Sequence, residues 1–132
     1  MSTASGGRVL DTTALLHIAT GTTPYARELV DTAITAGLTL AVPSAALAAA
    51  WAAAAPAGRL FIDDLLDRSP VVVDPLGSAG ARTAGVVVTG GRAPIEQGHV
   101  VASARARGWP VITGQPGRLL ALAADVDIRA LP

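Results

Sequence analysis

Short apolar runs alternate along the chain with longer stretches in which apolar residues recur every three or four positions. The short runs have the length and β-branched content of buried strands, and they cover residues 8–10, 38–42, 71–73, 111–113 and 127–131. The longer stretches have helical spacing and cover residues 12–19, 25–36, 45–55, 59–68, 76–88, 94–107 and 116–124. Strands that alternate with helices predict an α/β fold, a three-layer α/β/α sandwich around a parallel sheet of four to five strands.

Proline and glycine mark the ends of these stretches. Pro43 ends the second strand, and Pro94 suits the first turn of the helix that Gly108 closes. Gly37 is placed to end a helix whose apolar positions begin at Tyr25. There is no internal repeat or linker, so we expect a single domain over 1–132, in which the Ser/Gly-rich residues 1–7 form a flexible N-terminus.

The amino-acid composition excludes several kinds of functional site. The chain has 132 residues, of which 51% are hydrophobic, and this is enough apolar material for one domain with a proper core. All ten basic residues are Arg, which together with the Ala, Gly and Pro content indicates a GC-rich, actinobacterial-type genome. Cysteine is absent, so disulfides, thiolate metal sites and thiol nucleophiles are excluded. No apolar run is long enough to cross a bilayer, and we expect a cytoplasmic protein without a membrane partner.

Asp11 directly follows the first predicted strand. In parallel sheets, ligands gather at the carboxyl ends of the strands, so a carboxylate at this position can hold a metal or act as a base. Asp is also a good N-cap, and Thr12 and Thr13 open the helix that follows. Taken alone, Asp11 is predicted to cap this helix.

Four segments, in order, give the chain a resemblance to PIN-domain ribonucleases, the family of VapC-type toxins. Residues 9–16 (VLDTTALL) resemble the family's first strand and acid, and residues 42–49 (VPSAALAA) its second strand and glutamate-bearing helix. Residues 97–105 (QGHVVASAR) resemble the helix that opens with an aspartate, and residues 109–116 (WPVITGQP) the fourth strand with its closing Thr-x-Asp. The resemblance covers nearly the whole chain and implies a PIN-like fold.

The resemblance also implies a site that this chain has largely lost. PIN nucleases gather carboxylates that bind Mg²⁺ or Mn²⁺, and the metal activates a water beside the scissile phosphate. Here Asp11 matches the first acid, whereas Ala49, Gln97 and Gln115 stand where the other three are expected. One carboxylate and two amides hold Mg²⁺ poorly, so we expect a catalytically degenerate member with no cofactor. Thr113 matches the Thr of the closing motif, where its hydroxyl can bind Asp11, a ligand or backbone groups.

Other polar residues are poorly placed to replace the missing carboxylates. Glu96 adjoins Gln97 but points about 100° away around the helix. Asp63, Asp64 and Asp67 fit a solvated face on which Arg59 pairs with Asp63 and Arg68 with Asp64. The two histidines, His17 and His99, are interpreted as structural.

The positive charge is concentrated in one part of the chain. Between Ala79 and Leu120 the charged residues are five Arg against Glu96 alone, which gives +5 − 1 = +4. Two interpretations are open: these arginines form a solvated surface, or they face the phosphates of RNA. The five residues are Arg82, Arg92, Arg105, Arg107 and Arg118.

Three readings follow. The first is a pseudo-nuclease that acts by binding RNA or a protein partner; the resemblance implies an antitoxin-like partner and a homodimer. The second is an active Mg²⁺- or Mn²⁺-dependent ribonuclease that uses Asp11 with a displaced acid such as Glu96. The third is that the resemblance misleads and the chain is another small doubly wound domain, which a structure with the first and fourth strands apart would support.

Overall fold

The computed structural model describes residues 6–91 and 93–132. Its strands are β1 (Gly7–Leu10), β2 (Thr39–Pro43), β3 (Val71–Asp74), β4 (Val111–Thr113) and β5 (Ile128–Ala130). Its helices are α1 (Thr12–Thr20), α2 (Tyr25–Thr35), α3 (Ser44–Ala53), α4 (Pro56–Leu66), α5 (Ser78–Val87), α6 (Ile95–Arg107) and α7 (Pro116–Leu122). In this part of the chain, no helix is long and apolar enough to cross a membrane.

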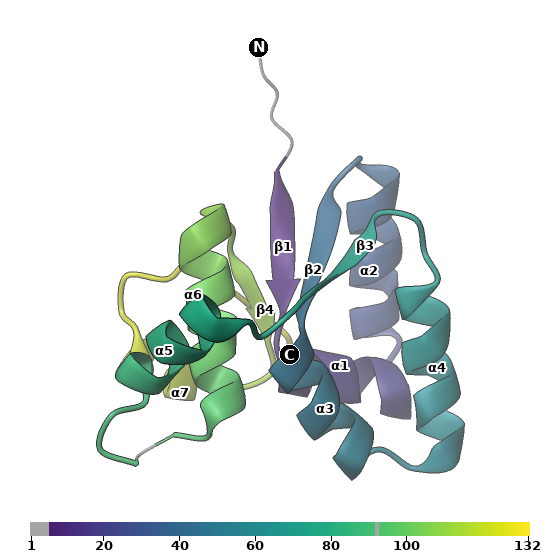
Figure 1. Ribbon diagram of the computed structural model, residues 1–132. Coiled ribbons are helices and arrows are strands. Elements are labelled where there is room, and N and C mark those ends of the chain that lie inside the picture. Colours follow the sequence, from purple (N-terminus) through teal and green to yellow (C-terminus); the bar gives the residue numbers. More distant parts are fainter. Residues whose placement is uncertain (1–5, 92) are drawn as a thin grey trace.

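The five strands form one parallel sheet in the order β3-β2-β1-β4-β5. In Figure 1, α5, α6 and α7 gather beside β4, while α2 and α4 lie beside β2 and β3, with α1 and α3 below. The fold is therefore the predicted α/β sandwich, with the larger number of strands in the predicted range. Because β1 pairs with β4, the structure lacks the separation of these two strands that would have supported an unrelated doubly wound domain.

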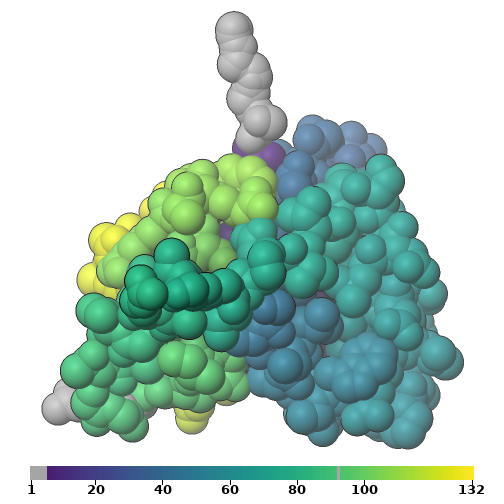
Figure 2. Space-filling view, viewed as in Figure 1, coloured from purple at the N-terminus to yellow at the C-terminus, as the bar shows by residue number. Residues whose placement is uncertain are grey.

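Small aliphatic side chains make the core. The central strands β1 and β2 are buried on both faces, and Val9, Leu10, Leu40 and Val42 have no exposed surface. On the helices, alanines and one glycine let backbones approach closely. At Gly98 an added methyl group would collide with the carbonyl oxygen of Ala84, so α6 packs directly against α5. Figure 2 shows α5 lying over α6 without a gap.

The boundaries differ from the sequence prediction in a few places. The fourth helix begins at Pro56 rather than at residue 59, because proline is well suited to the first helical position. Pro94 is the N-cap of α6 rather than part of its first turn. The buried face of α2 is Ala26, Val30 and Ala33, whereas Tyr25 is 49% exposed. The apolar spacing that begins at Tyr25 therefore predicts the helix, although Tyr25 lies outside its buried face.

Candidate functional site

The candidate site lies where β1 and β4 end side by side. Val9 pairs with Val111 and Leu10 with Ile112, so the next residues of both strands reach the same carboxyl edge of the sheet. Asp11 follows β1 at this edge, and Thr113 ends β4. Asp11 and Thr113, which are far apart in the sequence, therefore lie at the same carboxyl edge of the sheet.

Asp11 is the N-cap of α1. Its Oδ1 accepts the backbone N–H of Ala14 at 2.9 Å and the hydroxyl of Thr13 at 2.7 Å. The side chain is buried, with only 6% of the residue's surface exposed. The capping role predicted from the sequence is therefore present.

Burial also changes the protonation of this carboxyl. Loss of hydration raises the pKa of Asp11 above its usual value, because the charged form is the one that water stabilises. Hydrogen bonds from Thr113, Ala14 and Thr13 favour the charged form and lower the pKa, but burial is the larger effect. The charged form of Asp11 is therefore less favourable in this site than in water.

Two threonine hydroxyls join the ends of β1 and β4. Thr13 Oγ1 accepts the backbone N–H of Gly114 at 2.7 Å and lies 3.4 Å from Thr113 Oγ1. Thr113 is fully buried, and its hydroxyl accepts the backbone N–H of Gln115 at 2.9 Å. Of the roles open to Thr113, the structure shows two, toward backbone groups and toward Asp11. Thr13 was missed in the sequence; its position two residues after a capping Asp was the available signal.

The other degenerate positions are spread around this edge. Ala49 lies half-buried on α3, and Gln115 is exposed as the N-cap of α7, where it forms no side-chain capping bond. Gln97 and Arg118 line one hollow of about 490 Å³ beside the start of α6. Glu96, half-buried, precedes Gln97 in the first turn of that helix. Within residues 6–91 and 93–132, no three Asp, Glu or His side chains are grouped so that they could hold a metal.

A second polar cluster lies at the end of β3 and was not predicted. Asp74 accepts two hydrogen bonds from Arg107, and this pair, together with Ser103 and His99, lowers the pKa of the Asp74 carboxyl. His99 is buried on α6, and its Nδ1 accepts the backbone N–H of Ala45 at 3.3 Å. Burial lowers the pKa of His99, while the charge of Asp74 acts in the other direction. His99 therefore supports the start of α3, which agrees with its structural interpretation.

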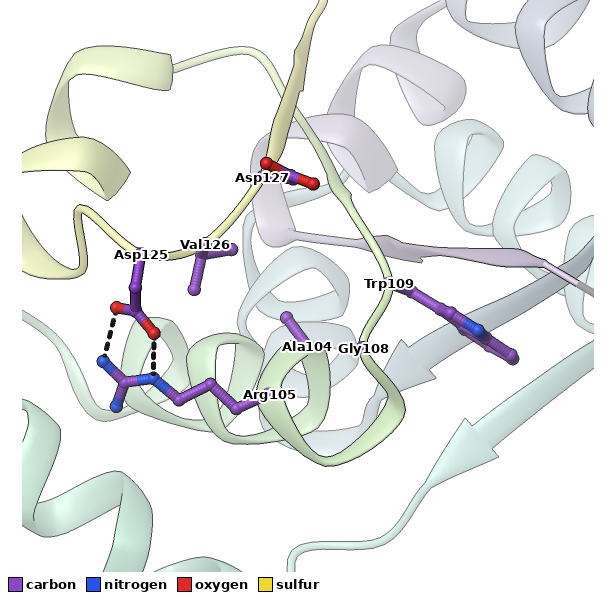
Figure 3. A pocket seen from close by; sticks show the side chains of 7 residues that line it. All are labelled: Ala104, Arg105, Gly108, Trp109, Asp125, Val126 and Asp127. Atoms are coloured by element: carbon purple, nitrogen blue, oxygen red, sulfur yellow. Dashed lines mark hydrogen bonds and ion pairs between the residues drawn. The ribbon is translucent and has the colours of Figure 1, made fainter.

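Two of the five arginines in the positively charged half of the chain are paired with carboxylates. Arg105 makes two hydrogen bonds to Asp125, as Figure 3 shows at a hollow of about 280 Å³ where β4 and β5 begin. Arg107 is paired with Asp74, and Arg82 bonds the hydroxyl of Ser78. Arg92 lies outside the described residues. Acids distant in sequence thus neutralise two of the five arginines.

The helix-surface pairs predicted on α4 also form differently. Arg68 pairs with Asp31 of α2 at 2.9 Å, and Arg59 donates to the carbonyl of Trp51 and lies over its ring. Asp63, Asp64 and Asp67 are exposed, as expected for a solvated face. The predicted pairing of Arg59 with Asp63 and Arg68 with Asp64 is wrong, because both guanidiniums reach neighbouring elements.

Comparison with solved structures places this architecture in a known class, the PIN-like α/β domains. One similar structure is VapBC2 from Rickettsia felis, bound to a DNA fragment from the promoter of these proteins. It superposes on this chain with a TM-score of 0.70 at 12% sequence identity, over 93% of this chain and 97% of the matched chain. DNA-bound VapBC from Salmonella typhimurium gives 0.68 at 16% identity, over 95% and 98%. The chain therefore has the PIN-like fold of VapC. No protein-family model matches the sequence, and neither does any curated protein.

Proposed function

We propose that this chain is a PIN-like pseudo-nuclease that acts by binding a protein partner rather than by cleaving RNA. The state of Asp11 carries the proposal. Its carboxylate is buried, already accepts two hydrogen bonds and has a raised pKa, so it is built as a helix cap more than as a metal ligand.

The metal that the PIN-like fold implies does not fit the residues present. Mg²⁺ and Mn²⁺ prefer charged oxygen ligands. This edge offers one buried carboxylate, two amides at Gln97 and Gln115, and a methyl group at Ala49. We therefore assign no catalytic step to a metal.

The nature of the partner follows from charge. The chain has a formal net charge of zero, and Arg105 and Arg107 are paired with carboxylates. RNA affinity depends on free cations that displace counterions from phosphates, so this surface favours a protein partner. The similar structures are VapBC assemblies, which supports an antitoxin-like protein in that role.

The first test is cleavage. The parent protein, Asp11→Ala and Glu96→Gln are incubated with a mixed RNA substrate and Mn²⁺ at millimolar concentration. We expect no cleavage by any of them. Cleavage by the parent that disappears in Asp11→Ala would overturn the proposal, and its loss in Glu96→Gln would establish the displaced-acid ribonuclease in its place.

The second test restores the lost acids. A variant that combines Ala49→Glu, Gln97→Asp and Gln115→Asp is assayed in the same way. Cleavage by this variant but not by the parent would support the degeneracy. The control adds Asp11→Ala to the restored variant and is expected to be inactive, because the metal would again lose its first ligand.

A further inference from the structure

A second feature lies on one face of the sheet, between Arg8 of β1 and Arg129 of β5. Alternate residues of a strand share a face, so Arg8 points to the same side as Leu10. Leu10 pairs with Ile112, and Ile112 with Arg129, so both arginines lie on this face. Strand spacing and residue rise put their Cα atoms about 12 Å apart, with Ile112 between them. Two long cationic side chains can therefore converge over one apolar residue.

The space beneath these arginines is an apolar hollow of about 210 Å³. It lies between α2, which runs beside β2 in Figure 1, and the β1–β4–β5 part of the sheet. Its floor and walls are Ile112, which is only 3% exposed, with Leu29, Thr32, Ala33, Ala36 and Leu38. Among the described residues that line it, the charged ones are Arg8 and Arg129.

Both guanidiniums have unused hydrogen-bonding capacity. Arg8 Nη1 donates to the carbonyl of Gly7 at 2.8 Å, and Arg129 Nη1 donates to the carbonyl of Ile128 at 3.2 Å. Within the described ranges, neither forms an ion pair, in contrast to Arg68, Arg105 and Arg107. A guanidinium has five N–H donors, so each retains several that can bind an anion.

We propose that this hollow binds a small aliphatic monocarboxylate. The two guanidiniums would hold the carboxylate through charge-assisted hydrogen bonds, and the hydrocarbon chain would lie against Leu29, Ala33 and Ile112. The volume is below the range of sites that take larger ligands, which limits the occupant to a short chain of about six carbons. The site goes beyond the proposed function and does not depend on whether the Asp11 edge supports cleavage.

The experiment titrates hexanoate into the methyl-labelled protein and follows the methyl resonances of Ile112 and Leu29 by NMR. We expect saturable shifts with hexanoate and none with 1-hexanol or hexylamine, which share its chain but carry no negative charge. Arg8→Gln and Arg129→Gln should each weaken binding about tenfold or more, because each removes charge-assisted hydrogen bonds. Arg82→Gln, an exposed arginine elsewhere, is the matched control and should bind like the parent.

Ala36→Leu provides a variant that keeps both guanidiniums. Ala36 is exposed on the wall of the hollow, so a larger side chain should fill the space without disturbing the core, and hexanoate binding should be lost. Equal responses to hexanoate and 1-hexanol, or unchanged hexanoate binding in both Gln variants, would overturn the proposal. So would binding only by acetyl-Gly-Leu with a free carboxyl terminus, since this would identify the occupant as the end of a peptide.

Discussion

The side chain of Asp11 experiences two opposing effects. Its oxygen accepts the first free N–H groups of α1, which stabilises the helix, but its negative charge lies in a buried environment that raises its pKa. In the folded state the carboxyl binds its proton more tightly than in the unfolded chain. The charged carboxylate therefore costs stability above the folded pKa, and this cost disappears as the pH falls through the usual value of 3.8.

This balance predicts different effects for two substitutions. Asp11→Ala removes the acceptor and should lower the free energy of unfolding by about 1–2 kcal/mol, the usual cost of losing an N-cap. Asp11→Asn keeps an oxygen acceptor without the buried charge, and should be as stable as the parent or more stable at pH 7. Urea unfolding measures both. A loss in Asp11→Asn as large as that in Asp11→Ala would show that the charge itself is required.

His99 predicts a loss of stability in mild acid. Its Nδ1 accepts the N–H of Ala45, so the imidazole must be neutral at that nitrogen, and burial lowers its pKa. The unfolded chain then binds a proton more readily than the folded one, and stability should fall as the pH drops through 6.5. Urea unfolding gives the free energy of unfolding at pH 7.5 and at pH 5.5. The difference between these two values should be smaller in His99→Gln than in the parent. An identical difference in the two proteins would contradict this role.

At the scale of elements, the α5–α6 contact predicts opposite outcomes for two glycines. Gly98→Ala places a methyl group against the carbonyl of Ala84, and we expect a loss of about 1–3 kcal/mol in spite of the better helix propensity of alanine. Gly85→Ala, on α5 with open space around it, should gain about 0.5–1 kcal/mol. Thermal or urea unfolding compares them directly. A stabilising Gly98→Ala would show that the two helices separate easily.

Two arginines near the end of α6 predict unequal effects on stability. Arg107 bonds Asp74 through two nitrogens and lies 4.6 Å from the Trp109 ring centre, so it links α6 to the end of β3. Arg107→Ala should cost about 1 kcal/mol, less in high salt. Arg105 and Asp125 make a similar pair in solvent, and Arg105→Ala should leave stability near that of the parent. Equal losses at both sites would indicate that burial and stacking contribute nothing.

The sequence predicted elements better than contacts, for a physical reason. Strand and helix limits follow from local rules, and residues such as Pro43, Gly37 and Gly108 impose them on the backbone itself. The partners of Arg68 and Arg107 come from elements distant in the sequence, so they depend on how helices are placed on the sheet. At the site, the cap on Asp11 was predictable from its local context, whereas Thr13 acquires its bond to Gly114 only when β1 and β4 meet.

At the scale of the whole molecule, the net charge predicts how strongly the protein binds RNA. With a net charge of zero and two arginines paired, we expect no RNA binding at about 0.15 M salt. Fluorescence anisotropy of a labelled single-stranded RNA, measured from low to physiological salt, tests this. A variant with Asp74→Asn and Asp125→Asn releases Arg107 and Arg105 and should gain affinity at low salt. Tight, strongly salt-dependent binding by the parent would instead support RNA as the partner.

The central position of β1 has a consequence for how the chain is made. One neighbour, β2, follows within about thirty residues, but the bond from Gly114 to Thr13 joins positions 101 residues apart. At a synthesis rate of about 5–20 residues per second, β1 leaves the ribosome roughly 5–20 s before β4. During that interval the strand keeps one edge without a partner, and such an edge readily pairs with the wrong chain. The strand that ends directly before Asp11 therefore needs protection until β4 has been synthesised.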